Sequence, residues 1–168
     1  MKIIVVGAGK VGYSVAKILS EEGHDITVID RDPETITHLS NELDVICVEG
    51  SATNHETLLG AGAAEADLLM AATQQDEVNM VCGITARKLG TKHVIARIRD
   101  TEYLRQTEFL REVLGLSITI NPEYECAKEI ARILRFPSAA RVDTFSKGSV
   151  EIVEHRVREH GKLDGMQL

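Results

Sequence analysis

The first thirty residues constrain the fold more than any other stretch of this chain. An apolar run at 2–6 is followed at once by the glycine-rich sequence GAGKVG at 7–12, and then by a segment with helical periodicity. A second apolar run, 26–29, ends at Asp30. Strand, glycine loop, helix, strand and acid in this order are typical of a fold that binds a dinucleotide or another adenosine nucleotide.

Each glycine of this loop has a separate physical task in such a fold. We expect Gly7 to allow a tight turn, Gly9 to let a pyrophosphate approach the backbone, and Gly12 to let the helix pack closely on the sheet. The helix that begins near Lys10 directs free N–H groups and a partial positive charge at the phosphates. Asp30 can accept hydrogen bonds from both ribose hydroxyls. The alternative is a tight strand–helix turn that holds no ligand.

Composition excludes several other classes of protein. The 168 residues suit one domain with a small appendage, and 43% of them are hydrophobic but only 4% aromatic, so we expect an aliphatic core. No apolar run reaches the roughly 18 residues of a membrane span, and the chain starts directly with a strand, which predicts a cytosolic protein without membrane insertion. The net charge of −7 argues against nucleic-acid binding. The three widely spaced cysteines are interpreted as buried free thiols.

The remaining sequence alternates between strand and helix periodicity. Right-handed crossovers then predict an α/β, Rossmann-like, doubly wound sheet of six parallel strands in the order 3-2-1-4-5-6, with the ligand over the first and fourth strands. After residue 136 two β-like runs around Lys147-Gly148 predict a short hairpin. We expect strands at 2–6, 25–30, 45–48, 66–72, 93–98 and 117–120, and helices at 10–23, from 33 onward, and at 54–61, 76–89, 102–114 and 122–135.

Polar or small residues also follow the third and fourth strands. Ser51 and Ala52 offer backbone N–H groups near the adenine and ribose, or else form a simple loop. Thr73 and Gln74 lie across from the glycine loop, where Thr73 can donate to a phosphate or sugar. Helix capping is the competing role for Thr73, although Asp76 is better placed as the cap.

The fifth strand carries two arginines, and Arg97 is favoured over Arg99 as a partner for phosphate oxygens. Asn79, on the first turn of the helix at 76–89, could face the same cleft. None of the six histidines has metal-ligand spacing, and no nucleophile motif or acid/base pair is present. The residues after 136 are too few for the substrate lobe of a dehydrogenase. The sequence therefore predicts nucleotide binding without a catalytic or metal site.

Several blocks of sequence closely resemble the TrkA family, the cytosolic regulators of Trk-type potassium uptake with RCK/KTN domains. The resemblance covers residues 1 to about 140. Residues 148–168 resemble the opening of that family's smaller C-terminal domain, so we expect a nucleotide-binding domain at 1–136 and a linker with an incomplete second domain at 137–168. The blocks that carry the resemblance are GAGKVG at 7–12, DRD at 30–32, GSAT at 50–53, TQQDEVNM at 73–80, ARIR at 96–99 and EYL at 102–104.

The resemblance implies a function and a set of ligand contacts. Such proteins bind NAD(H), with ATP or ADP as alternatives, and form dimers or tetramer rings on the cytosolic face of the plasma (inner) membrane. There they gate a Trk-type potassium-translocating membrane protein through lobe movement, with the helix at 122–135 crossing to a partner subunit. The contacts implied here are Gly7, Ala8, Gly9, Lys10, Val11, Gly12, Asp30, Arg31, Ser51, Ala52, Thr73, Gln74 and Arg97.

Two alternatives to this regulatory function remain open. One is an NAD(P)-dependent oxidoreductase fragment that lacks its substrate domain, and the other is an NAD sensor in an assembly without a membrane partner. Arg31 could accept the 2′-phosphate of NADP, but Asp30 would repel that phosphate, so an unphosphorylated ribose is favoured.

Overall fold

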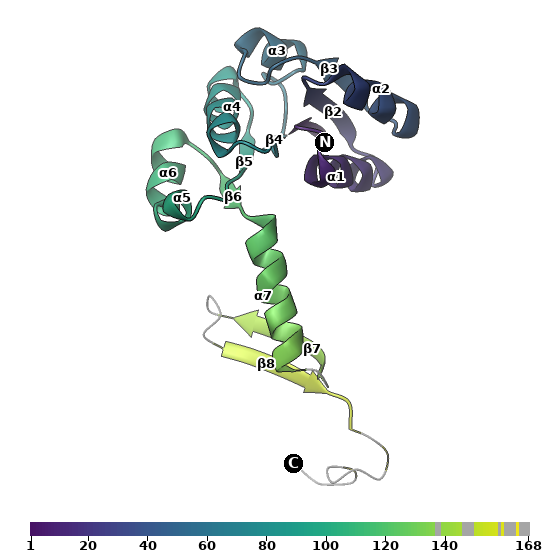
Figure 1. The fold of residues 1–168 in the computed structure, drawn as a ribbon, viewed down its shortest axis with the longest axis vertical. Coiled ribbons are helices and arrows are strands. Elements are labelled where there is room, and N and C mark those ends of the chain that lie inside the picture. The colour runs from purple at the N-terminus through teal and green to yellow at the C-terminus, as the bar shows by residue number, and fades with distance from the viewer. Residues whose placement is uncertain (137–138, 146–149, 158, 160–163, 165–168) are drawn as a thin grey trace. The chain divides into compact units, whose positions relative to one another are not determined.

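The computed structural model describes residues 1–136, 139–145, 150–157, 159 and 164. Its contacts divide the chain into two compact units, Met1–Asn121 and Pro122–Leu168, each of which is described by itself. The sequence-based division after residue 136 instead groups the helix at 122–135 with the sheet. The first unit contains β1 (Lys2–Val6), α1 (Lys10–Glu21), β2 (Asp25–Asp30), α2 (Pro33–Glu42), β3 (Ile46–Glu49), α3 (His55–Gly60), β4 (Leu68–Ala71), α4 (Asp76–Leu89), β5 (His93–Arg97), α5 (Thr101–Arg105), α6 (Thr107–Leu114) and β6 (Ile118–Ile120) (Figure 1).

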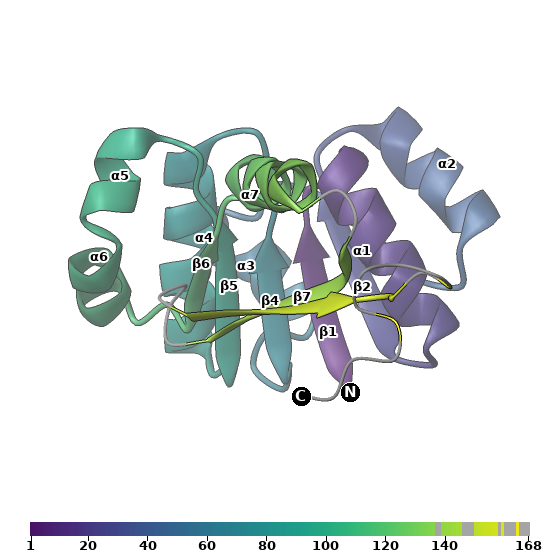
Figure 2. The same cartoon turned by 90° about the horizontal axis from the view of Figure 1, so that it is seen from below.

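The six strands of the first unit form one parallel sheet in the order β3-β2-β1-β4-β5-β6, which confirms the predicted fold. Figure 2 shows β1, β4, β5 and β6 of this sheet side by side. Val6 at the end of β1 is paired with Ile29 of β2 on one side and with Ala71 of β4 on the other. The carboxyl ends of these three strands are therefore level with one another. Because the strand order reverses between β1 and β4, the loops after them separate and leave room for a ligand at this edge.

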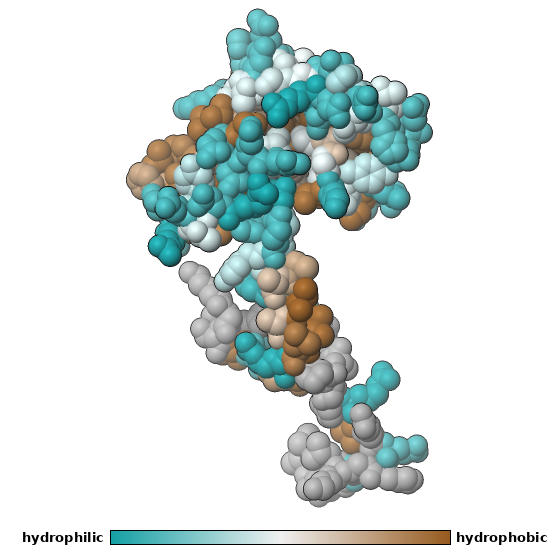
Figure 3. Space-filling view, in the orientation of Figure 1, coloured by the Kyte–Doolittle hydropathy of each residue, from teal (hydrophilic) through white to brown (hydrophobic). Residues whose placement is uncertain are grey.

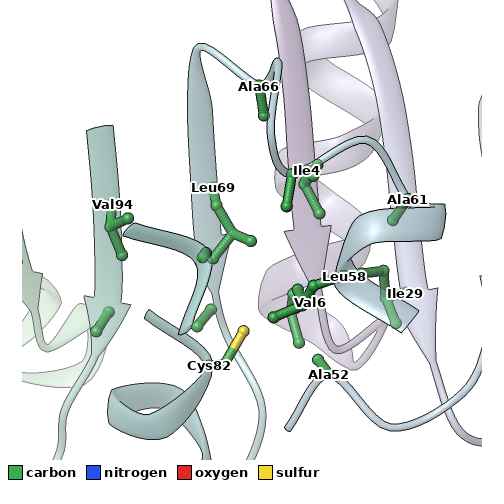
Figure 4. Packing of buried hydrophobic residues seen from close by; sticks show 14 of the residues in the cluster. Ile4, Val6, Ile29, Ala52, Leu58, Ala61, Ala66, Leu69, Cys82 and Val94 are labelled. Carbon is green, nitrogen blue, oxygen red and sulfur yellow. The ribbon is translucent and has the colours of Figure 1, made fainter. Parts of the chain in front are cut away.

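Both faces of the sheet are covered by helices, which is why its strands are nearly continuous apolar runs. Ile3 and Val5 of β1 pack beneath α1 and α2, in one buried cluster. Ile4 and Val6 point to the opposite face and join a second cluster with side chains of α3, α4 and α6. Figure 4 shows this second cluster, in which Leu58 of α3 lies beside Val6. Each fully buried aliphatic side chain contributes about 1.5–3 kcal/mol of transfer free energy, so the sheet is a rigid support for its loops.

Local signals explain where two of the helices begin and end. The carboxylate of Asp32 accepts a hydrogen bond from the Glu34 N–H at 3.2 Å, and proline occupies the next position, so α2 starts where the sequence predicts. The single helix expected at 102–114 is instead two helices, α5 and α6. They meet at Gln106, whose N–H bonds to the Tyr103 carbonyl three residues earlier and ends α5.

The second unit consists of α7 (Pro122–Arg135) and an antiparallel hairpin of β7 (Ala139–Phe145) and β8 (Val150–His155). The hairpin confirms the expected pair of strands, although its turn at 147–148 and most of 160–165 lie outside the described residues. Ala139 and Ala140, interpreted as linker from the sequence, belong to β7. Apolar side chains are exposed along α7 (Figure 3), at Tyr124, Ile130, Ile133 and Leu134.

The cysteines differ in burial between the two units. Cys82 of α4 is buried, and the apolar surroundings raise the pKa of its thiol to about 12. Cys47 is half-buried, and Cys126 on α7 is exposed. The expectation of three buried thiols is therefore correct for Cys82 and wrong for Cys126. In the described part of the chain, no helix is long and apolar enough to cross a membrane.

Candidate functional site

The three glycines of the β1–α1 loop are required for three different reasons. Gly7 has a φ of +86°, and a methyl group there would lie 3.0 Å from Thr73 of the β4–α4 loop. A methyl group at Gly12 would lie 1.8 Å from the Gly7 carbonyl oxygen, because α1 rests on the loop. A methyl group at Gly9 would have no described atom within 4 Å. Gly7 and Gly12 are thus needed by the fold, whereas Gly9 keeps the approach to the loop open.

The amino end of α1 presents unpaired backbone donors at the same edge. Its first intrahelical bond runs from the Tyr13 N–H to the Gly9 carbonyl at 2.8 Å, so the amides of residues 10–12 precede the hydrogen-bonded turns. Among the described residues, no side chain caps this end. Lys10 is exposed and adds a positive charge. These features make the start of α1 suited to an anion such as a phosphate.

Asp30, at the end of β2, joins the loops that surround the edge. Its Oδ2 accepts a hydrogen bond from the Ala8 N–H at 2.7 Å, and its Oδ1 accepts one from the Asp32 N–H at 3.0 Å. Its backbone carbonyl accepts from Gly50 in the loop after β3. Because each carboxylate oxygen has a second lone pair, both can still accept a ribose hydroxyl. The neighbouring Arg31 is exposed.

The two predicted ligand residues in the loop after β3 differ in their exposure to solvent. Ser51 is exposed, with its hydroxyl 2.9 Å from the Thr53 hydroxyl. Ala52 is buried in the cluster beneath α3, so its methyl group packs in the core. Only the backbone of Ala52 is available to a ligand.

The loop after β4 is tied to α4 and β5 by one side chain. Asn79 Oδ1 accepts from both the N–H and the hydroxyl of Thr73, at 2.9 and 2.7 Å. Its Nδ2 donates to the Thr73 carbonyl at 3.2 Å and to the Arg97 carbonyl at 2.8 Å. Asn79 is fully buried, so it lies inside the sheet edge and does not face the cleft as the sequence suggested. The only signal for this role was an asparagine, a weak helix former, in the first turn of a helix.

Asp76 has a different role from the predicted one. Gln75 is the N-cap of α4, and no described side chain caps the helix at that position. The Asp76 carboxylate instead accepts from the N–H groups of Arg99 and Asp100 at 2.7 and 2.8 Å, because β5 ends beside the start of α4. Its second oxygen lies 3.8 Å from the Arg99 guanidinium.

Arg97, the last residue of β5, and Arg99, two residues after it, are held differently. Arg99 also donates to the carbonyl of Gln74, a residue that is otherwise exposed. Arg97 is buried, on the strand position before Ile98, which packs in the cluster beneath α4. The guanidinium of Arg99 therefore bonds to the β4–α4 loop, while Arg97 lies buried at the end of β5.

The structure brings most of the predicted ligand residues to one edge. The contact between Gly7 and Thr73 and the hydrogen bond between Ala8 and Asp30 place the loops after β1, β2 and β4 side by side. A separate surface hollow of about 410 Å³ lies along α2 and contains none of these residues. In the part of the chain that the structure describes, no group of three acidic, histidine or cysteine side chains could hold a metal ion.

Comparison with known sequences identifies relatives of this chain. Residues 3–122 match the family described as the TrkA-N domain. Over 168 residues the chain is 40% identical to a protein of Archaeoglobus fulgidus named Trk system potassium uptake protein TrkA homolog. That alignment covers all of this chain and 38% of the relative, so the chain spans about two fifths of the length of the relative it matches.

Solved structures with low sequence identity share the fold. The TrkA-N domain of the inner membrane protein ybaL from Escherichia coli superposes with a TM-score of 0.70 at 22% identity, over 79% of this chain and 96% of that one. The GsuK channel bound to NAD gives 0.62 at 23% identity, over 85% of this chain and 24% of that one. GsuK bound to ADP gives 0.61 at 22% identity, over 71% and 31% of the two chains.

Proposed function

The chain belongs to the TrkA-N domain family, and from this premise we propose that it is the nucleotide-binding part of a regulator of potassium uptake. The relative from Archaeoglobus fulgidus is named for such a system, and its full length is about two and a half times that of the present chain. The cytosolic location, the membrane partner and the control of that partner belong to this proposal. The loops at the carboxyl edge of the parallel sheet support this proposal.

The observation that carries the proposal is the pairing of an open amino end of α1 with the Asp30 carboxylate. The amides of 10–12 suit phosphate oxygens, and the two carboxylate oxygens suit the hydroxyls of one ribose. Both NAD(H) and ADP or ATP contain this ribose and its phosphates. NAD is the ligand in one structural neighbour and ADP in another, which supports NAD(H) as the ligand with ADP or ATP as alternatives.

The remaining ligand contacts are part of the proposal, and the positions of several of these residues support them. Arg31, Gln74 and Ser51 are exposed beside the edge, and Arg97 is buried at the end of β5. Asp30 disfavours a 2′-phosphate by charge repulsion, so NAD(H) binds in preference to NADP(H). The proposed ligand set is Gly7, Ala8, Gly9, Lys10, Val11, Gly12, Asp30, Arg31, Ser51, Ala52, Thr73, Gln74 and Arg97.

The nucleotide is bound as a signal, without chemistry on it. Asn79 and Asp76, two polar side chains near the edge, are committed to structural hydrogen bonds. Cys82, which is buried with a raised pKa, is a poor nucleophile. The rival function is an oxidoreductase fragment. Incubation of the chain with NADH and a panel of carbonyl compounds, followed by NADH absorbance, distinguishes the regulatory function from the oxidoreductase function. We expect NADH to bind without being oxidised. Stoichiometric oxidation of NADH would overturn the regulatory function.

The output of binding is a change in assembly. In this proposal α7 belongs to the nucleotide-binding domain at 1–136, and residues 137–168 begin a second domain. The exposed apolar side chains of α7 contact a second copy of the chain. A nucleotide moves such an assembly only by the difference between its affinities for two arrangements. Dimers or rings on the cytosolic face of the membrane then bias a potassium-translocating partner.

A further inference from the structure

Asn79 and Thr91 are the two polar residues among the largest fully buried side chains of the described residues. Asn79 makes none of the proposed ligand contacts. We infer that Asn79 is a positioning residue, whose side-chain amide orients Thr73 toward the nucleotide. Through Asn79, contact between a nucleotide and Thr73 changes the hydrogen bonding at the ends of β5 and β6. The inference rests on the proposed nucleotide site for its ligand, but the connection itself is present in the ligand-free chain.

The hydrogen bonds of Asn79 use its whole amide. Its oxygen accepts two bonds from Thr73, and its nitrogen donates one bond to the Thr73 carbonyl and one to the Arg97 carbonyl. An amide has two donor protons and two acceptor lone pairs, so no capacity remains. A buried network that is fully satisfied in this way has one preferred geometry, and removal of one partner leaves buried backbone groups unpaired.

Thr73 connects Asn79 to the glycine loop. Its backbone and methyl group lie at 3.0 Å from the position of a methyl group on Gly7, so the two loops are in close contact. The Thr73 hydroxyl has one proton, for which Asn79 Oδ1 at 2.7 Å is the nearer acceptor and the Gln75 carbonyl at 3.2 Å the farther one. A phosphate or sugar oxygen that receives this proton competes with both acceptors, because the hydroxyl cannot donate twice, and the shorter bond that it displaces is the one to Asn79. Ligand contact at Thr73 therefore changes the bonding of Asn79.

The other side of Asn79 leads to the sixth strand. Beyond the Arg97 carbonyl, the Ile98 N–H donates to the Ile120 carbonyl at 2.9 Å, and the side chain of Asn121 donates to the Arg99 carbonyl at 3.4 Å. The end of β5 is thus bonded to Asn79 on one side and to the end of β6 on the other. In the sequence, α7 begins at the next residue, Pro122.

The substitution Asn79→Asp tests the connection, because it keeps the shape and removes the donors. As a carboxylate the new side chain faces two carbonyl oxygens, and as a neutral acid it regains one donor. Burial favours the neutral form, so the defect should be reversed at low pH. Asp76 and Arg99 lie in the same region, so each variant is compared with the wild type at the same pH. Asn54→Asp is the matched control, since the exposed Asn54 side chain only accepts, from the Glu56 N–H.

Hydrogen exchange of the full ligand-free chain, measured by mass spectrometry, is the readout. At pH 8 we expect residues 97–100 of Asn79→Asp to exchange about tenfold faster than in the wild type, and at pH 5 the ratio should fall toward one. Asn54→Asp should match the wild type at both values. Wild-type rates in Asn79→Asp at pH 8, or a defect that persists equally at pH 5, would overturn the inference.

Thr73→Val provides a second, milder variant that keeps Asn79 in place. With ADP or NADH added, wild-type exchange should slow at 7–12 and also at 97–100 and 118–121. In Thr73→Val we expect slowing at 7–12 only, and equal slowing at the distant segments would refute transmission through Thr73. If neither nucleotide changes exchange anywhere in the wild type, the proposed function fails, whereas the ligand-free comparison of Asn79→Asp still decides the connection.

Discussion

The two units of this chain treat their apolar side chains in opposite ways. In the first unit, Val5, Val28 and Leu69 are completely buried between the sheet and its helices. In the second, Ile133 and Leu134 of α7 are 59% and 73% exposed. A helix of 14 residues with such a face is marginal by itself and gains most of its stability from packing. The first unit therefore buries its apolar side chains within itself, whereas these apolar side chains of α7 are left exposed.

This difference separates two sources of stability. Folding of the first unit depends on contacts within one chain, so it is independent of protein concentration. In the proposed assembly a second copy covers the apolar face of α7, so the order of the second unit should follow the law of mass action. A ligand site placed on the first unit and an interface placed on the second can then influence each other through the residues that join them.

Removal of the second unit, residues 122–168, is expected to have the largest effect. The remaining chain keeps its sheet and should be a folded monomer, while the full chain associates through α7. Light scattering at matched concentrations, with circular dichroism as the control for folding, measures this. A dimer that persists after the truncation would show that the interface lies in the first unit.

Two leucine truncations compare the units directly. Leu69→Ala removes a fully buried side chain from β4 and should lower the free energy of unfolding by about 2–5 kcal/mol. Leu134→Ala, at a concentration where the chain is monomeric, should change it by less than about 0.5 kcal/mol. Urea denaturation gives both values. Similar losses for the two variants would mean that α7 is packed within a single chain.

Two glycines of the β1–α1 loop provide a smaller contrast, because we expect one to be required for stability of the fold and the other for nucleotide affinity. Gly12→Ala drives a methyl group against the Gly7 carbonyl and should cost about 1–3 kcal/mol of stability. Gly9→Ala meets no described atom, so stability should stay near that of the wild type, while affinity for ADP falls about tenfold because the methyl group occupies the phosphate approach. Equal stability of the two variants would show that α1 does not rest on the loop as described.

Periodicity in the sequence was sufficient to predict most of the fold. β2 and α4 have the predicted bounds, because an apolar run that ends at a charged or turn residue is a local signal. The bonds at the site edge are not local, since Asn79 and Arg97 lie 18 residues apart and Asp76 and Arg99 lie 23 apart. No pattern within one helix or strand reports which distant carbonyl a side chain will meet.

The glycine loop shows the same limit within six residues. The motif predicts a tight turn at Gly7, an open approach at Gly9 and close packing at Gly12, and the described geometry agrees for all three. It does not predict that the close packing of Gly12 is against the Gly7 carbonyl itself, or that Thr73 abuts Gly7. These contacts depend on how the β1 and β4 loops meet, which is a property of the assembled sheet.

The central claim is that the Asp30 edge binds an adenosine ribose, and calorimetry tests it most directly. NADH and ADP are titrated into the wild type, Asp30→Asn, which keeps an acceptor for the Ala8 N–H, and the exposed control Asp44→Asn. We expect one site per chain, with both affinities about tenfold weaker in Asp30→Asn and unchanged in Asp44→Asn. Wild-type affinities in Asp30→Asn, or loss of one nucleotide without the other, would contradict the claim.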